Sequence, residues 1–375
     1  MTDTPIPADI VAVSDYERHA AELLDAGTWA YLAGGVADER TLDWNRSAFD
    51  RLALKGRVLR DLTGGHTRLD LFGTTLPHPI LIAPMGHQGL VHAEAERATA
   101  QAAAALGTLM VASTAATLDM ETIAEAGGGA PQWFQLYFQI ERSLNELLIA
   151  RAEAAGYRAL VVTVDAAING VRNREQRAGY KLPQTLIPAN LKAFPPPAPR
   201  YLRDDESLVF DGLLAGAPTW EDIAWIKAHT RLPVILKGIT APEDAALALQ
   251  AGVDGIIVSN HGGRTLDTLA ASIDLLPAIA AELSGRLPIL IDGGFRRGTD
   301  ILKALALGAT AVLIGRPILH GLTVAGARGV LHVLQLLATE LEIAMALTGC
   351  RTLGDIGPQV FHSLPAPAFH KERSG

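Results

Sequence analysis

Eight short apolar segments recur along the chain and alternate with alanine- and leucine-rich stretches of helical periodicity. The apolar segments lie at residues 79–83, 108–112, 133–138, 159–164, 233–236, 255–258, 288–291 and 311–314. The helical stretches include residues 93–106, 143–155, 242–251 and 299–307. Apolar runs without polar alternation are typical of parallel strands buried on both faces. Eight strand–helix units over roughly 250 residues predict a closed α/β barrel, a (β/α)8 TIM barrel, with a doubly wound sheet as the alternative.

The same pattern predicts one domain over residues 1–375. Residues 1–60, including the stretch 16–32, form an N-terminal helical segment, and residues 61–350 form the barrel. The interval between the fourth and fifth strands is far longer than the others and contains the proline-rich stretch 193–200. A loop of this length is either a disordered surface loop or a lid over an active site. Its position after a strand end favours a lid, which we place at residues 175–218, with a short helix at 220–229.

Composition excludes several classes of function. A formal net charge of −8 argues against nucleic acid or an anionic membrane surface as the main partner. Charges such as Lys303 and Arg316 interrupt the apolar stretches, and the first residues lack the pattern of a secretory signal. The lone Cys350 excludes an intramolecular disulfide and fits a reducing compartment. We therefore expect a cytoplasmic protein without a membrane span.

Polar residues and glycine turns follow every predicted strand. In this fold the carboxyl ends of the strands meet at the face where active sites form. Polar strand ends are common, so each residue alone is weak evidence, but a lysine, a glutamine and a tyrosine inside apolar segments need buried partners. The side chains and turns predicted at this face are those of Pro84, Met85, Gly86, Ser113, Gln135, Tyr137, Thr163, Asp165, Lys237, Ser259, His261, Asp292, Gly294, Gly315 and Arg316.

The segment 259–267, Ser-Asn-His-Gly-Gly-Arg-Thr-Leu-Asp, is the most specific of these strand ends. His261 can exchange a proton near neutral pH, and Arg264 can bind a carboxylate through two parallel hydrogen bonds. Together they suit proton abstraction from a small carboxylic acid. The alternative is a polar turn in which the histidine only caps or packs.

The last two strand ends predict a phosphate site. Residues 292–298 combine glycines with Arg296, and Gly315 and Arg316 follow the eighth strand. Loops in these two places commonly bind phosphate in a barrel of this kind. The alternative is a pair of solvated arginines in ordinary turns. A phosphate here, with Lys237 and Gln135 deeper in the mouth, indicates a phosphorylated cofactor lying across the barrel.

Taken in order, these motifs resemble one family. Residues 31–35, 134–137, 163–165, 236–238, 259–267, 292–298 and 315–317 are similar to the FMN-dependent 2-hydroxy acid oxidases and dehydrogenases, which include glycolate oxidase, lactate oxidase and mandelate dehydrogenase. The likeness runs from about residue 16 to residue 350. Ala115 stands where glycolate oxidases carry a tryptophan, and residues 89–92 and 168–172 also resemble lactate oxidases. The small side chain implies room for a substrate larger than glycolate.

The resemblance assigns roles to the substrate site. Arg172, Arg264 and the Tyr31 hydroxyl would hold the substrate carboxylate. His261 would take a proton, from either the α-carbon or the hydroxyl, and Tyr137 would donate a hydrogen bond to the substrate oxygen. From the residues alone, a tyrosine such as Tyr31 is more often a core residue, and residues 172–177 would be a solvated charged loop.

The resemblance also implies the cofactor, FMN, and the residues that bind it. Asp165 would pair with His261 and stabilise the imidazolium, although an aspartate there could instead cap a helix. Lys237 would lie near flavin N1 and O2 and stabilise the reduced ring. Arg296 and Arg316 would bind the phosphate. The other contacts with the cofactor would come from Pro84, Met85, Gly86, Ser113, Gln135, Thr163, Ser259, Asp292, Gly294 and Gly315.

These inferences predict FMN-dependent oxidation of an L-2-hydroxy acid, lactate-like or larger, to the 2-oxo acid. We expect O2 to reoxidise the flavin and yield H2O2, with a quinone or cytochrome acceptor as the alternative. The family resemblance implies a homotetramer. Flavin-barrel isomerases and nitronate-oxidising enzymes are less favoured, because their substrates carry no carboxylate for two arginines. A barrel that binds a phosphorylated ligand without turnover would leave His261, Asp165 and Tyr137 without a purpose.

Overall fold

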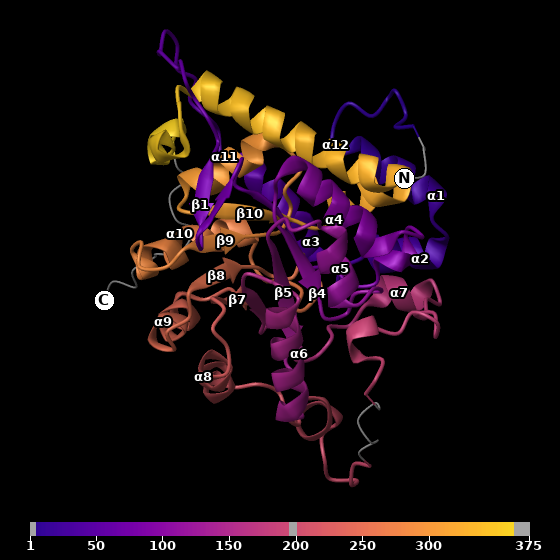
Figure 1. Ribbon diagram of the computed structural model, residues 1–375. Helices are drawn as coiled ribbons and strands as arrows, with labels where there is room; N and C mark the ends of the chain where they lie inside the picture. The colour runs from indigo at the N-terminus through magenta and orange to yellow at the C-terminus, as the bar shows by residue number, and fades with distance from the viewer. Residues whose placement is uncertain (1–4, 195–200, 364–375) are drawn as a thin grey trace, which may run out of the picture.

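The computed structural model describes residues 5–194 and 201–363 and contains a closed barrel of eight parallel strands (Figure 1). Neighbouring strands follow the order of the sequence, and the last pairs with the first to close the sheet. The predicted barrel is therefore confirmed, with each strand within three residues of its predicted position. The barrel strands are β3 (Ile80–Ile82), β4 (Met110–Ser113), β5 (Gln132–Tyr137), β6 (Leu160–Thr163), β7 (Val234–Ile239), β8 (Gly255–Val258), β9 (Ile289–Ile291) and β10 (Ala311–Ile314).

Helices surround the barrel and occupy the stretches expected from the periodicity (Figure 1). Their apolar faces pack against the outward side chains of the strands in one large core. The helices are α1 (Asp15–Leu23), α2 (Ala26–Ala33), α3 (Arg40–Ser47), α4 (Ala95–Leu106), α5 (Met120–Ala126), α6 (Arg142–Ala154), α7 (Asn173–Arg177), α8 (Trp220–Ala228), α9 (Pro242–Gln250), α10 (Ser272–Leu283), α11 (Gly298–Ala306) and α12 (Arg316–Thr348).

Side chains alternate strictly between the outside and the inside of the barrel. On β7, for example, Val234 and Leu236 belong to the outer core, whereas Ile235 belongs to a separate inner cluster with Trp133 and Leu290. Successive side chains of a strand point to opposite faces, so the residue two positions after each inner apolar residue also points inward. Because of this alternation, the polar side chains at the carboxyl ends of the strands point into the same opening of the barrel.

A short hairpin closes the opposite end of the barrel and was not predicted. Strands β1 (Leu69–Leu71) and β2 (Thr74–Leu76) pair antiparallel around a turn in which Phe72 and Gly73 both have positive φ. Leu71 and Leu76 are buried within the inner cluster, and the Phe72 ring lies 5.6 Å from that of Trp133. Strands of three residues are too short to produce a recognisable alternation, which explains the missed prediction.

The N-terminal segment is helical over α1 to α3 and a short 3-10 turn, Ala48–Arg51, and not over the whole of residues 1–60. After this turn the chain has no helix before residue 60, and Leu54 forms an isolated antiparallel bridge with Phe361. Because α2 ends beside the barrel mouth, Tyr31 and Leu32 line the cavity described below. The segment is therefore part of the site.

Within the described residues, one helix, α12, is long and apolar enough by length and composition to cross a membrane. Sequence reasoning counted Arg316 as an interruption, but Arg316 begins the helix, and Arg328 is the only charge between it and Glu340. Its backbone departs from helical geometry at Ala325 and Gly326, and it packs against α1, α4 and α11. These contacts make it an outer helix of the barrel. Just after it, the Cys350 thiol is buried.

The long segment between β6 and β7 is confirmed, and its described parts carry little regular structure. It includes α7, a 3-10 turn (Ala189–Leu191) and a π-helical turn (Leu208–Leu213). The buried Asn190 side chain donates to the backbone oxygens of Ser113 and Thr114 and accepts from the Met120 backbone N–H. The segment is thereby attached to the carboxyl end of β4. Most of the proline-rich stretch 193–200 lies outside the described residues.

The hairpin should contribute measurably to stability. Replacing Leu76, which is fully buried, by alanine should lower the free energy of unfolding by about 2–5 kcal/mol, because it removes apolar contacts and leaves a cavity. Chemical denaturation measures this change. Val11→Ala, at an exposed position, is the matched control and should change stability by less than about 0.5 kcal/mol. Equal effects for the two variants would show that the hairpin does not close the core.

Candidate active site

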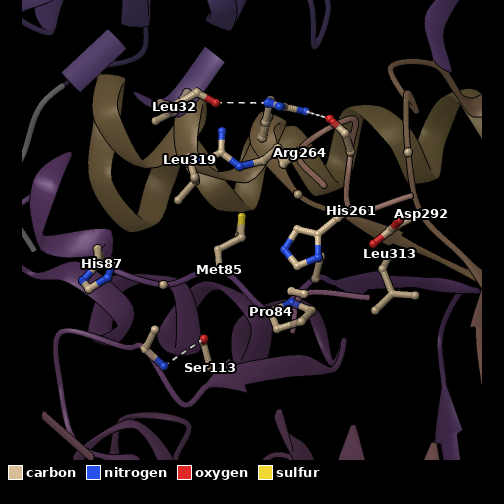
Figure 2. Close-up of a pocket in the computed structure, with 18 of the residues that line it drawn as sticks. Leu32, Pro84, Met85, His87, Ser113, His261, Arg264, Asp292, Leu313 and Leu319 are labelled. Carbon is tan, nitrogen blue, oxygen red and sulfur yellow. Dashed lines mark hydrogen bonds between the residues drawn. The ribbon is translucent and has the colours of Figure 1, made fainter. Parts of the chain in front are cut away.

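The carboxyl ends of the strands surround a cavity of about 530 Å³. This volume is within the range of small-molecule and cofactor sites, roughly 300–1,000 Å³. Figure 2 shows His261 facing it between Pro84, Met85 and Asp292, with Arg264 on the side of the long C-terminal helix. The predicted site residues that line the cavity are Tyr31, Pro84, Met85, Gly86, Ser113, Ala115, Tyr137, Arg172, Lys237, His261, Arg264, Asp292, Gly294, Arg296, Gly315 and Arg316.

The four other predicted residues, Gln135, Thr163, Asp165 and Ser259, lie behind this wall. The Ser113 hydroxyl donates to Gln135 Oε1 at 3.0 Å, and Gln135 Nε2 donates to Thr163 Oγ1 at 3.0 Å. Ser259 Oγ accepts hydrogen bonds from Lys237 Nζ and from the His261 backbone N–H. These hydrogen bonds join the residues to the wall of the cavity, and the predicted contacts of Gln135, Thr163 and Ser259 with the cofactor stay predictions.

His261 and Asp165 form a pair at the ends of β8 and β6. Nδ1 of His261 lies 3.0 Å from Oδ1 of Asp165, and both side chains are largely buried. Burial would raise the pKa of Asp165, but the hydrogen bond and charge of His261 and the charge of Lys237 outweigh it and hold the pKa below its usual value. Gly238 makes room for the pair, because a Cβ there would lie 2.5 Å from the Asp165 side chain. The carboxylate therefore fixes the ring with Nε2 free.

Lys237 is a buried cation at the end of β7. Its Nζ lies 3.0 Å from Asp292 Oδ2 and donates to Ser259 Oγ at 2.9 Å. Burial alone would lower the pKa of Lys237, but the carboxylates of Asp292 and Asp165 raise it above its ordinary value. The other oxygen of Asp292, Oδ1, is buried without a partner. This network keeps a positive charge at the mouth and leaves one acceptor available to a ligand.

Two arginines meet beside an aromatic stack. Arg264 Nη1 donates to the backbone oxygens of Tyr31 and Gly34, at 2.7 and 2.9 Å, and its guanidinium lies 5.1 Å from the Tyr31 ring centre. Burial and the nearby charge of Arg172 lower the pKa of Arg264. The Tyr31 ring also stacks on Tyr180, with ring centres 5.0 Å apart. Sequence reasoning missed Tyr180, which has no periodic or motif context in the long loop.

The predicted phosphate end contains Arg296 and the N-terminus of α12, which begins at Arg316. The Arg316 guanidinium donates to three backbone oxygens, those of Leu32, Gly34 and Gly262. Burial, with the charges of Arg264 and Arg296, lowers the pKa of Arg316 to about 9. Arg316 therefore joins the N-terminal segment to the barrel here. Since a guanidinium has five N–H groups and three of them are used, two remain, and its contact with a phosphate stays a prediction.

Gly294 is required at this end of the cavity. Its φ is +86°, and a Cβ on it would lie 1.9 Å from the backbone oxygen of Asn45. Only glycine adopts this conformation without strain, and no side chain would fit. The close approach of α3 to the loop after β9 thus depends on the glycine that sequence reasoning assigned to phosphate binding.

A barrel whose mouth combines an oriented histidine, paired arginines and a phosphate-binding end defines an enzyme that uses a phosphorylated cofactor on a small carboxylic acid. Comparison with known proteins agrees. The family model described as FMN-dependent dehydrogenase matches residues 20–363. The L-lactate oxidase of Alicycliphilus denitrificans is 50% identical over 351 residues, covering 94% of this chain and 96% of that protein.

Two further relatives carry aromatic substrates in their names. The 4-hydroxymandelate oxidase of Amycolatopsis orientalis is 44% identical over 92% of this chain and 96% of its own length. A solved structure of a mandelate oxidase variant with (S)-mandelic acid superposes with a TM-score of 0.85 at 40% identity, covering 95% of this chain and 99% of that one.

The chain belongs to the FMN-dependent dehydrogenase family. The comparisons confirm the predicted family, the cofactor FMN and the oxidation of 2-hydroxy acids as the class of reaction. The nonenzymatic alternative, a barrel that only binds a phosphorylated ligand, is not supported.

His261 is the residue whose loss should affect chemistry most directly. His261→Ala should retain bound FMN, because His261 is not part of the predicted phosphate end, but should slow flavin reduction by substrate about 10²–10⁴-fold. Anaerobic stopped-flow absorbance of the flavin measures the rate. His66→Ala, in the loop before β1, is the matched control and should reduce at the parental rate. A His261 variant near full rate would exclude the acid–base role.

Proposed function

We propose that this enzyme oxidises an L-2-hydroxy acid of lactate size or larger to the 2-oxo acid, with O2 as the electron acceptor and H2O2 as the second product. The observation that carries the proposal is the convergence of His261, Arg264 and Arg172 on one cavity. A quinone or cytochrome acceptor is less favoured, because the relatives include several enzymes named as oxidases.

The residues at the mouth fit FMN. Arg296, Arg316 and the backbone N–H groups at the start of α12 would hold its phosphate. The unpartnered Oδ1 of Asp292 is suited to accept a hydrogen bond from a hydroxyl group of the cofactor. Lys237 provides the positive charge that would lie against the pyrimidine part of the ring. When bound, FMN supplies the acceptor for the two electrons that the substrate loses.

The chain's own residues then bind the substrate and remove its proton. Arg172 and Arg264 bind the carboxylate, as guanidinium groups do in paired geometry. With Nδ1 turned to Asp165, Nε2 of His261 is the atom that accepts the proton. The ionised Asp165 stabilises the resulting imidazolium, the role of the aspartate in a catalytic triad. Burial raises the pKa of Tyr137, so its hydroxyl stays protonated and can donate to the substrate oxygen.

The assembly and location are further parts of the proposal. We expect a homotetramer, as the family resemblance implies, and a cytoplasmic location. The exposed apolar side chains of Val58 and Leu59, in a loop whose Arg57 N–H donates to the Leu347 backbone oxygen, support self-association. Leu347 and Ile343 on α12 are exposed as well. The exposed apolar surface therefore includes side chains from the loop and from α12.

The reaction can be tested in one sequence of steps. Purified holoenzyme is mixed anaerobically with glycolate, L-lactate or L-mandelate while the flavin absorbance is followed, and air is then admitted. We expect bleaching by lactate or the larger acid, and rapid return of the colour in air with release of H2O2. Bleaching by none of the acids would contradict the proposed substrate class, and slow recovery in air would contradict O2 as the acceptor.

Ala115 should control the size of the substrate. It lines the cavity, and a Cβ on Gly86 would lie only 2.9 Å from the Ala115 methyl group, so little space separates this wall from its neighbour. Ala115→Trp should lower kcat/KM for mandelate at least about tenfold more than for glycolate, because a larger side chain excludes the bulkier acid. Steady-state oxygen uptake measures both. Equal losses for the two acids would place Ala115 away from the substrate side chain.

A further inference from the structure

Glu175 lies between the two arginines expected to bind the substrate carboxylate. One oxygen of its carboxylate, Oε1, is 3.4 Å from Arg172 Nη1 and 3.5 Å from Arg264 Nη2. The three side chains are only 15–21% exposed. A single acidic group therefore faces both guanidinium groups at the edge of the cavity.

The other acceptors of these arginines in the described structure are neutral. Arg264 Nη1 donates to two backbone oxygens, and Arg172 Nη2 donates to Asn169 Oδ1 at 3.1 Å. Neutral acceptors satisfy hydrogen bonds but do not cancel charge. Buried charges are costly unless they are paired, so Glu175 is the group here that compensates the arginines. Arg172 Nε is buried without a partner, so the pair still has a donor for a ligand.

The position of Glu175 is fixed by its own segment. It lies on α7, and its backbone oxygen accepts from the N–H of Tyr180. The Tyr180 ring stacks on Tyr31, which also lies against Arg264. The same helix is attached to the N-terminal segment by the ion pair between Arg174 and Glu39. The carboxylate is thus held at the arginines by packing on both sides.

The net charge of Arg172, Arg264 and Glu175 matches the ligand that the site is expected to bind. Arg172 and Arg264 together carry two positive charges, and Glu175 leaves a net charge of one, which matches one substrate carboxylate. The 2-oxo acid product carries the same carboxylate. A stronger positive charge would bind substrate and product alike, which does not accelerate chemistry, and it would slow release of the product, a step that often limits turnover.

We propose that Glu175 is the counter-ion of the two arginines that bind the substrate. Its carboxylate orients Arg172 and Arg264 and lowers their affinity for the carboxylate of the product, so that the product dissociates faster. Glu175 is a positioning residue and takes no part in proton transfer. The inference rests on the proposed function, because it takes a 2-hydroxy acid and a 2-oxo acid as the ligands.

The test compares charged and uncharged ligands. Oxidised holoenzyme is titrated with pyruvate and with its neutral amide, pyruvamide, and Kd is obtained from the change in flavin absorbance. Glu175→Gln should bind pyruvate about tenfold more tightly than the parent, because a nearby negative charge is removed. Its Kd for pyruvamide should stay within about twofold. Release of pyruvate, followed by stopped flow, should slow by a similar factor.

Matched variants separate charge from structure. Glu121→Gln, on α5, removes an ion pair with Arg151 away from the residues that line the cavity and should leave both Kd values unchanged. Glu175→Asp keeps the charge and should bind pyruvate within about threefold of the parent. Unchanged or weaker pyruvate binding by Glu175→Gln, or equal changes for the two ligands, would overturn the proposal. If Glu175→Gln does not fold, tenfold tighter binding of pyruvate alone by Glu175→Asp would overturn it.

Different results would contradict the proposed function and the role of Glu175. The proposed function fails if none of the 2-hydroxy acids bleaches the flavin of the parent enzyme. The ratio of Kd values between variants is measured on oxidised enzyme without turnover, so it reports on Glu175 whichever electron acceptor is used.

Discussion

Pairing of β10 with β3 closes the sheet, so each of the eight strands presents alternate side chains to one enclosed interior. The inner series on β7 runs from Ile235 to Lys237, and the series on β8 runs from Ile257 through Ser259 to His261. Apolar members fill the lower barrel, and polar members follow at the mouth. Because the strands are parallel, all of these polar ends reach the same face. An open sheet with the same sequence would not surround a cavity.

Charge compensation is the second condition for the site. Lys237 contacts Asp292 and feels the charge of Asp165, which is itself paired with His261. Farther along the mouth, Glu175 compensates two arginines. Groups fixed in this way need little rearrangement when charge moves during a reaction, which is the basis of electrostatic catalysis. By the proposal made for Glu175, the same compensation also limits how tightly an anion binds at the two arginines.

Much of this architecture could be predicted from the sequence, because strand ends in a barrel follow directly from continuous apolar runs. Asp165, Ser259 and Asp292, which contact His261 or Lys237, were predicted correctly at the mouth because each follows such a run. Glu175 and Tyr180 could not be found, since they come from an irregular loop whose path depends on packing against α2. The Phe72–Gly73 hairpin was too short for its period to show. The three backbone oxygens that the Arg316 side chain reaches could not be predicted either, because they depend on how the N-terminal segment packs on the barrel.

The single cysteine has a consequence for an enzyme that releases a peroxide. Oxidation of a thiol proceeds through its thiolate and requires access to solvent. Cys350 is 5% exposed, and burial raises its pKa, so the reactive form is scarce and shielded behind the end of α12. The protein therefore carries no readily oxidised sulfhydryl where its own by-product accumulates, and its working lifetime should not depend on a protective reductant.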